Sequence, residues 1–324
     1  MRYYSEKSAL ITGGLGFVGS NLARRMIKEG ADPTLLDTVK EEKLPTIEDI
    51  REDVTIVDAD IRESQAVESQ VLDSDIVFHL AAKTSRLAAN ENPRENLEIN
   101  CGGPLNVLES AADCEDPPRV VYVSSLATVG NVPGIIDETT EPNPVDIYGI
   151  HKRAVEDYCQ LYTRLKGVPT TVVRPANLYG PRSPLHAKGY GIINQFVGDA
   201  LRDDTLTVFE PSDLRDFLYI TDMVDALTRV GEDDRAIGET YELGTGESQT
   251  MKEAAELVID VAGSGSIETV PWPEDWEGIR RGDISLDPSK IETELGWSTS
   301  IGLEEGLHRT VNFYRSNREQ YLND

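Results

Sequence analysis

Short apolar runs alternate with longer helical patterns over the first two-thirds of the chain. Six such runs are bounded by turn residues or charges: residues 8–12, 34–37, 54–57, 76–80, 120–123 and 170–173. They carry no polar alternation, as expected of strands in a parallel sheet that is covered on both faces. Helical spacing of apolar residues marks residues 21–29, 104–112 and 154–166 between them. Alternating strands and helices predict a doubly wound α/β fold with a parallel sheet.

The alternation loosens after about residue 180. Residues 189–202, 251–262 and 301–315 have helical patterns among loops, and Trp272, Trp276 and Trp297 fall in this part. We therefore expect two lobes. Residues 1–180 would form the nucleotide-binding lobe. Residues 181–324 would form most of a smaller substrate lobe, with segments that return to the first.

A glycine-rich turn directly follows the first predicted strand. Gly14, Gly16 and Gly19 satisfy the pattern Gly-x-Gly-x-x-Gly, and Gly13, Gly16 and Gly19 satisfy Thr-Gly-x-x-Gly-x-x-Gly. Glycines in this context let the backbone approach a pyrophosphate, which the helix N-terminus attracts. The alternative is a tight turn without a ligand. The position between a strand and a helix favours a dinucleotide site.

Two acidic residues end the second and third predicted strands. Asp37 lies 18 residues beyond Gly19, where a carboxylate accepts hydrogen bonds from the adenosine ribose and repels a 2′-phosphate. Asp37 therefore favours NAD over NADP, although a loop acid or a helix cap would look the same. Asp60 either contacts the adenine or caps a helix, and the sequence favours neither.

Tyr148 and Lys152 are the strongest candidates for chemistry. Their i, i+4 spacing places them on one helical face, with Cβ atoms roughly 5–6 Å apart. A lysine ammonium beside a phenol favours the phenolate, which can take a proton from an alcohol. Ser124 and Ser125 follow the fifth predicted strand and supply hydroxyls near the same edge.

Composition excludes several classes of partner. The formal charge is −27, from 58 acidic and 31 basic side chains, which opposes binding to nucleic acid or to anionic membrane. The acidic side chains either form an ordinary solvated surface or reflect adaptation to high salt, where acidic surfaces are screened and keep a protein in solution. We expect the second, and with it a halophilic, haloarchaeal source. No apolar run reaches the roughly 18 residues of a membrane span, and no signal peptide is visible, so a cytoplasmic location is expected. The three cysteines lack metal-ligand spacing, and no metal is expected.

Taken in order, these motifs resemble the extended short-chain dehydrogenase/reductase family, and within it the nucleotide-sugar epimerases. The resemblance covers nearly the whole chain. Its further motifs are His79-Leu80-Ala81-Ala82, Asn100 with Gly103 and 106–109, Arg174 to Arg182, Arg215-Asp216-Phe217 with Asp222, Arg280 to Asp283 and Leu295-Gly296-Trp297. It implies a Rossmann nucleotide-binding lobe and NAD as the cofactor.

The resemblance also assigns roles to single residues. Tyr148 would be the general base and acid, Lys152 would bind the nicotinamide ribose, and Ser125 would hydrogen-bond the reacting hydroxyl, although Ser125 could also be a polar strand terminus. The implied cofactor ligands are Gly13, Gly16, Phe17, Val18, Gly19, Asp37, Asp60, Ile61, Leu80, Ala81, Ala82, Asn100, Ser124, Tyr148, Lys152, Arg174 and Pro175. The implied substrate ligands are Lys83, Ser125, Asn177, Arg215, Arg280 and Asp283.

The arginines among these suit phosphate because a guanidinium binds oxygens bidentately, but either could instead form a surface ion pair. His79 is expected to end a buried strand, and His151 to face away from Tyr148.

Two departures from the family pattern bear on the reaction. Val129 stands where the family has a tyrosine, which puts a contact to the sugar in doubt. Leu126 and Ala127 stand where the 4,6-dehydratases carry Asp-Glu and where the related decarboxylases need Glu. Elimination of water needs an acid to protonate the leaving hydroxyl, and neither residue can supply one.

The sequence therefore predicts an NAD-dependent nucleotide-sugar 4-epimerase of the UDP-glucose/UDP-galactose type. A net sugar or alcohol dehydrogenase would use the same Ser125, Tyr148 and Lys152 and stays open. A non-catalytic dinucleotide sensor would not need them. The resemblance further implies a homodimer, formed by residues 104–112 and 148–166 of each subunit.

Overall fold

The computed structural model describes residues 2–185, 191–280 and 282–322, and its centre is a seven-stranded parallel sheet. The strand order is β11-β7-β5-β4-β1-β2-β3, the doubly wound order in which the chain reverses direction beside β1. The strands are β1 (Ser8–Thr12), β2 (Asp32–Asp37), β3 (Thr55–Asp58), β4 (Ile76–His79), β5 (Arg119–Val123), β7 (Thr170–Pro175) and β11 (Thr240–Leu243). The predicted fold class is confirmed.

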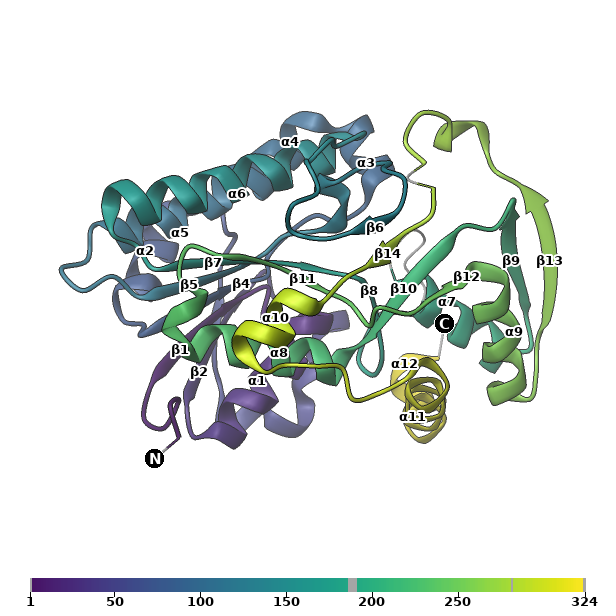
Figure 1. Ribbon diagram of the computed structural model, residues 1–324. Helices are drawn as coiled ribbons and strands as arrows, with labels where there is room; N and C mark the ends of the chain where they lie inside the picture. The colour runs from purple at the N-terminus through teal and green to yellow at the C-terminus, as the bar shows by residue number, and fades with distance from the viewer. Residues whose placement is uncertain (1, 186–190, 281, 323–324) are drawn as a thin grey trace.

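Helices cover both faces of this sheet (Figure 1). One face carries α2 (Ser64–Leu72), α5 (Gly103–Ala112) and α6 (Ile147–Lys166), and the other carries α1 (Phe17–Glu29) and α8 (Ile220–Glu232). Burial on both sides explains why the strands have no polar alternation: every residue of β4 is buried. Within the described part of the chain, no helix has the length and apolar character needed to cross a membrane.

The parallel register brings the carboxyl ends of the central strands to one edge. Thr12 of β1 pairs with Leu36 of β2 and with His79 of β4. Val123 of β5 pairs with Val173 of β7. The segments that follow these strands therefore lie together, although those after β1 and β7 begin at Gly13 and Ala176, far apart in sequence.

The remaining elements form the second lobe and the connections. Strands pair in three small sheets: β12 (Ser248–Thr250), β10 (Leu214–Tyr219) and β8 (Asn177–Tyr179); β13 (Ser266–Pro271) and β9 (Thr205–Glu210); and β14 (Ser285–Leu286) and β6 (Ile135–Ile136). The α-helices are α3 (Arg86–Glu91), α4 (Pro93–Leu97), α7 (Ile192–Leu201), α9 (Met251–Ala262), α10 (Ser289–Leu295), α11 (Leu303–Ser316) and α12 (Arg318–Tyr321). The helix predicted over 189–202 is α7, and residues 189 and 190 lie outside the described residues.

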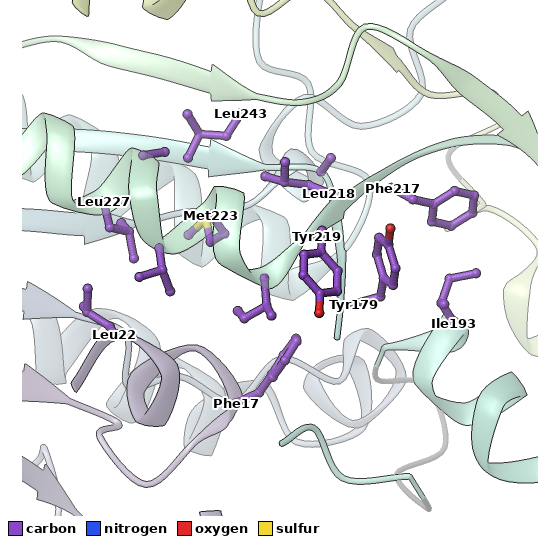
Figure 2. Packing of buried hydrophobic residues seen from close by; sticks show 14 of the residues in the cluster. Phe17, Leu22, Tyr179, Ile193, Phe217, Leu218, Tyr219, Met223, Leu227 and Leu243 are labelled. Carbon is purple, nitrogen blue, oxygen red and sulfur yellow. The ribbon is translucent and has the colours of Figure 1, made fainter. Parts of the chain in front are cut away.

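One hydrophobic core runs through both lobes. Figure 2 shows Phe17 and Leu22 of α1 in the same cluster as Ile193 of α7 and Phe217 of β10. In addition, β11 lies in the main sheet beside β7, although it comes from the second half of the chain. Segments of the C-terminal half thus lie against the N-terminal half, and a boundary at residue 180 stays a prediction.

Asp222 in the first turn of α8 ties the C-terminal chain to this core. Its carboxylate accepts hydrogen bonds from the Ser300 amide (3.0 Å), the Ser300 hydroxyl (2.7 Å) and the Ile301 amide (3.0 Å). The indole of Trp297 donates to the Asp222 carbonyl at 3.2 Å. Trp297 is buried here, whereas Trp272 and Trp276 pack on each other with ring centroids 5.8 Å apart.

We predict that Asp222→Ala lowers the free energy of unfolding by about 2–3 kcal/mol, because it removes the acceptor of the buried Ile301 amide and of the two partly buried Ser300 donors. Urea denaturation measures this change. Asp225→Ala on the same helix is the control, since its partner Arg25 forms only a half-exposed ion pair and the loss should stay below about 1 kcal/mol. Equal losses in the two variants would contradict the assignment.

Candidate active site

A cleft of about 990 Å³ opens at the carboxyl edge of the main sheet. Most of the site residues predicted from the sequence line it: Gly13, Gly16, Phe17, Val18, Gly19, Asp37, Asp60, Ile61, Leu80, Ala81, Ala82, Lys83, Ser124, Ser125, Tyr148, Lys152, Pro175 and Asn177. Five predicted residues do not line it: Asn100, Arg174, Arg215, Arg280 and Asp283. The roles of individual residues stay predictions, but the structure brings most of them to one place.

The glycine turn forms one wall of the cleft and fits a pyrophosphate. A Cβ atom on Gly19 would lie 2.4 Å from the Gly13 carbonyl oxygen, so a side chain there would push the turn apart. The turn leads into α1, a helix of 13 residues with no acidic side chain in its first turn, and Phe17 and Val18 of that turn line the cleft. The positive end of the helix dipole therefore faces the cleft without a competing carboxylate.

Asp37 holds the glycine turn by a hydrogen bond and also forms an ion pair with Lys43, which the sequence did not indicate. Its Oδ2 accepts from the Leu15 amide at 3.0 Å, and its Oδ1 accepts from the Lys43 ammonium at 2.5 Å. Lys43 lines the cleft, in the stretch of 3₁₀ turns at Glu41–Asp53. The end of the cleft where the sequence predicts the adenosine ribose thus presents a carboxylate and an ammonium together. The only sequence signal for Lys43 is its place six residues after Asp37.

Asp60 faces the same end of the cleft and is held by Arg62. The guanidinium donates to both carboxylate oxygens, at 2.9 and 2.7 Å, and these hydrogen bonds lower the pKa of Asp60. Arg62 also lines the cleft and was not among the predicted residues. Asp60 is therefore ionised and partnered, and its predicted contact to adenine stays open.

Thr12 organises the next wall, formed by Leu80 and Ala81. Its hydroxyl oxygen accepts from the amides of both residues at 3.2 Å and lies 2.9 Å from Nδ1 of His79. As predicted, His79 ends a buried strand. Burial lowers the pKa of His79 to about 3, so the imidazole is neutral and unsuited to proton transfer near neutral pH.

Asn100 stands behind this wall and holds Lys83. Its Oδ1 accepts from the Lys83 amide at 2.9 Å, and its Nδ2 donates to the Lys83 carbonyl at 2.8 Å. Asn100 is only 1 % exposed and lies in a π-helical turn, Glu98–Gly102. It therefore shapes the cleft through the backbone of Lys83.

Tyr148 and Lys152 lie in the first turns of α6. Asp146 caps this helix, its Oδ1 accepting from the Gly149 amide at 2.8 Å. Tyr148 is 6 % exposed, and the Lys152 ammonium lies 5.9 Å from the centre of its ring. Lys152 also donates to the Val123 carbonyl at 2.8 Å, which fixes the ammonium at the end of β5. Burial lowers the pKa of Lys152 to about 8.

The Ser125 loop packs directly on the helix of Tyr148. A Cβ atom on Gly149 would lie 2.3 Å from the Ala127 carbonyl oxygen, so glycine is needed where the two backbones meet. Ser125 begins the 3₁₀ turn Leu126–Thr128, and its hydroxyl accepts from the Ala127 amide at 3.1 Å. Leu126 and Ala127 are buried. The close approach brings Ser125 and Tyr148 to the same end of the cleft.

A buried network of charges lies beneath Ser124 and Lys152. The Ser124 hydroxyl donates to Glu156 at 2.5 Å, and Arg174 donates to Glu156 at 2.8 and 2.6 Å and to Glu242 at 2.8 Å. Arg174, predicted to touch the cofactor, thus lies beneath the cleft and binds two carboxylates. Glu156 was missed by the sequence reasoning, although its position four residues after Lys152 places it on the same face of α6.

Glu242 is the weakly satisfied member of this network. One of its oxygens is buried without a hydrogen-bond partner within the described residues, and the single guanidinium of Arg174 is shared with Glu156. Burial raises the pKa of Glu242 to about 8. Glu242 is therefore the group most ready to carry a proton, because Glu156 takes two of the Arg174 contacts and also pairs with Arg153, whereas Glu242 has a single contact from Arg174.

The predicted phosphate-binding arginines meet each other outside the cleft. Asp213, 3 % exposed, accepts from Arg215 at 3.2 Å and from Arg280 Nε at 3.0 Å. Asp283 accepts from the Leu214 amide at 2.8 Å. Arg280 lines a separate hollow of about 410 Å³ with Asn131 and Gly282. Arg281, in the same motif, lies outside the described residues.

The charge of the cleft is opposite in sign to that of the chain. Of the described side chains that line it, seven are basic and four acidic, whereas the whole chain has 31 basic and 58 acidic side chains. The basic ones are Lys40, Lys43, Arg62, Lys83, Arg86, Lys152 and Arg182. Local positive charge in an acidic protein favours an anionic ligand, and a dinucleotide or nucleotide sugar is one.

The family follows from comparison with known proteins. A model of the NAD dependent epimerase/dehydratase family matches residues 9–244. The chain belongs to this family. NAD is therefore its cofactor, and the cradle of glycines and the basic cleft fit that ligand. The protein is an enzyme of the extended short-chain dehydrogenase/reductase type.

Relatives of this enzyme differ in their reactions. It is 31 % identical over 313 residues to a putative UDP-glucose 4-epimerase of Methanocaldococcus jannaschii, covering 95 % of this chain and 98 % of that one. It is 29 % identical over 324 residues to a UDP-N-acetyl-alpha-D-glucosaminuronate decarboxylase of Bacillus cytotoxicus, covering 96 % and 98 %. The UDP-glucose 4-epimerase of Thermotoga maritima, solved with UDP-glucose, superimposes with a TM-score of 0.86 at 28 % identity, covering 96 % and 99 %. The family relationship therefore leaves the reaction type open.

The buried network predicts a pH dependence of stability. Because the pKa of Glu242 rises from 4.5 to about 8 on folding, its contribution is fully present below about pH 4.5 and is lost as the pH rises through about 8. We predict that Glu242→Gln, which stays neutral, gains stability relative to the wild type as the pH rises from 5 to 9. Thermal unfolding across this range measures the difference. Glu239→Gln, at a partly exposed carboxylate that pairs with Lys290 at 2.7 Å, is the control and should give a constant offset. A constant offset for Glu242→Gln would contradict the prediction.

Proposed function

We propose that the enzyme is an NAD-dependent nucleotide-sugar 4-epimerase acting on UDP-glucose, UDP-galactose or close relatives. One arrangement carries the proposal: Ser125, Tyr148 and Lys152 share the cleft, and the two residues after Ser125 are the apolar Leu126 and Ala127. The first feature supplies proton transfer at an alcohol carbon. The second withholds the acid that elimination would require.

The substrate class is supported by the cleft and by the relatives. Seven basic side chains in a strongly acidic protein favour a diphosphate. UDP-sugars appear in the names of both curated relatives and in the Thermotoga maritima complex. Asn177 lines the cleft on the side of the C-terminal lobe, where a nucleotide diphosphate would lie beside it.

Tyr148 performs the proton transfers in this proposal. Its phenolate takes the proton of the sugar 4-hydroxyl, while the Ser125 hydroxyl hydrogen-bonds the same oxygen and holds it in place. Bound NAD would supply the hydride chemistry at C4. The 4-ketosugar turns within the cleft, and Tyr148 returns the proton to the oxygen after hydride has reached the other face of the carbon.

The Lys152 ammonium stabilises the Tyr148 phenolate electrostatically in this proposal. The ammonium lies 2.8 Å from the Val123 carbonyl and 5.9 Å from the Tyr148 ring centre, so it holds positive charge near the phenol in a buried site. A cation close to a phenol stabilises the ionised form. The fixed position costs no reorganisation during the reaction.

We predict that the wild type interconverts UDP-glucose and UDP-galactose, or another UDP-, dTDP- or GDP-hexose pair, in buffer with molar salt. Product analysis by chromatography measures the conversion. The absorbance of NADH should stay constant during turnover, because the hydride returns to the sugar. Steady accumulation of NADH would instead indicate a net dehydrogenase, and no conversion of any hexose in the panel would refute the proposal.

Tyr148→Phe should lower kcat by about 10²–10⁴-fold with NAD still bound, because only the proton-transfer group is lost. Thr163→Ser on the same helix, away from the cleft, is the matched control and should keep wild-type turnover. Full activity in Tyr148→Phe would exclude this residue as the acid and base.

The proposed assembly is the homodimer predicted from the sequence, through α5 and α6. Leu97, Ile150, Leu161 and Leu165 on α4 and α6 are 49, 48, 38 and 65 % exposed. Part of the face predicted from sequence is not available, because Val107, Leu108 and Val155 are buried in the subunit's own core. An isologous interface would therefore use Leu161 and Leu165 with the partly exposed Tyr158 and Tyr162.

We predict a dimer in molar salt that dissociates as salt is removed. With a net charge of −27, repulsion between subunits reaches about 30 Å at 0.01 M salt but only about 3 Å at 1 M. Sedimentation velocity across a salt series measures the change. Leu161→Asp should give a monomer even at high salt, whereas Leu72→Asp on α2, 51 % exposed, should not. A salt-independent monomer would contradict the proposal.

A further inference from the structure

Arg86 joins three elements at the rim of the cleft. It is the first residue of α3, lines the cleft, and has a side chain only 13 % exposed. Its Nε donates to Asp146 at 2.5 Å, and its Nη2 donates to the Ile279 carbonyl. The guanidinium also lies 5.6 Å from the ring centre of Trp276. Figure 1 shows α3 between α6 and the chain that leads into β14.

The first partner, Asp146, controls the start of the helix that carries Tyr148. The Asp146 side chain is fully buried, and its two oxygens have separate tasks. Oδ2 accepts from Arg86, and Oδ1 accepts from the Gly149 amide at 2.8 Å. A second contact from α3 reinforces the first, since Asn90 accepts from the Ile147 amide at 3.0 Å. Both neighbours of Tyr148 in sequence are thus held by contacts that involve α3.

The second partner, Ile279, belongs to the C-terminal lobe. Its neighbour Arg280 donates to Asp213 at 3.0 Å, and its guanidinium lies 4.7 Å from the ring centre of Trp272. Asp213 also accepts from Arg215, which in turn donates to the Gly282 carbonyl at 2.5 Å. This segment is therefore one connected set of polar contacts, and Arg86 links it to the start of α6.

We propose that Arg86 is a positioning residue that couples occupancy of the nucleotide site in the C-terminal lobe to the placement of Tyr148. This inference rests on the proposed function and on the expectation from the sequence that Arg280, which lines the hollow of about 410 Å³, binds the diphosphate of the nucleotide sugar. A ligand that orders the segment before Arg280 orders the Ile279 carbonyl, and through Arg86 the carboxylate of Asp146. The first turn of α6 then holds Tyr148 in the geometry for proton transfer.

The planar guanidinium is suited to this role because it presents several donors in a fixed geometry. A lysine in its place would carry the charge for Asp146 on a single nitrogen and would not span both partners. Without any cation, the buried Asp146 carboxylate would lack compensation and would turn toward solvent. The Gly149 amide would then lose its cap, and the first turn of α6 would loosen.

Arg86→Met and Arg86→Lys test the proposal, with Arg25→Met as the matched control. Arg25 also links two elements, since it pairs with Asp225 of α8, but it lies away from the cleft. In Arg86→Met we expect kcat to fall by about 10–100-fold while KM for the nucleotide sugar and the affinity for NAD change less than about twofold. Arg86→Lys should recover part of kcat, and Arg25→Met should keep it. A kcat within twofold of the wild type in Arg86→Met would overturn the proposal.

Amide hydrogen exchange over residues 146–150 gives a second readout that needs no turnover. In the free enzyme, Arg86→Met should speed exchange of the Gly149 amide, and Arg25→Met should not. UDP should slow this exchange in the wild type and have no effect in Arg86→Met. If exchange of the Gly149 amide is unchanged in free Arg86→Met, Arg86 does not hold the first turn of α6. If UDP does not slow this exchange in the wild type, nucleotide binding is not coupled to that turn. If the wild type converts no nucleotide sugar, the proposed function fails, and these exchange rates alone decide the role of Arg86.

Discussion

The site depends on the parallel register of the main sheet. Because β1, β4, β5 and β7 run in the same direction, their carboxyl ends meet at one edge, and the segments that follow them face a common space. The glycine turn, Ala81 and Ser125 reach the cleft for this reason. Backbone contacts then set the spacing: the Gly149 Cα lies so close to the Ala127 carbonyl that a side chain would not fit.

Helix α6 connects the chemistry to the interior. The same side that carries Tyr148 and Lys152 toward the cleft carries Glu156 into a buried network with Arg174 and Glu242. Glu156 pairs with both Arg174 and Arg153, whereas Glu242 has only one contact from Arg174 and is the carboxylate whose pKa burial raises to about 8. The other end of the first turn is held by Asp146 and Arg86. Tyr148 and Lys152 are therefore held both from beneath the cleft and at its rim, which suits the two proton transfers of the proposed reaction.

Positive and negative side chains are distributed unevenly between the cleft and the rest of the protein. The protein carries a large negative charge overall, yet basic side chains outnumber acidic ones around the cleft. Several of these cations are paired with acids, as in Lys43 with Asp37 and Arg62 with Asp60. Pairing holds the cations in place and limits their net field, so a polyanionic ligand meets fixed hydrogen-bond donors near the surface of an acidic protein.

The amino-acid sequence determined the strands, the glycine turn, Asp37, and the pair Tyr148 and Lys152, because each depends on local spacing: apolar runs, glycines between a strand and a helix, or an i, i+4 pair. It did not determine which charges meet across the fold. Arg174 was expected beside the cofactor and lies beneath the cleft against Glu156 and Glu242. Arg215 and Arg280 were expected to be open to phosphate and share Asp213. Val107, Leu108 and Val155 were expected at a subunit interface and are in the core. Partners such as Arg174 and Glu242, 68 residues apart, or Arg280 and Asp213, 67 residues apart, leave no periodic signal, because their contact depends on how strands and helices pack, and only the tertiary structure decides that.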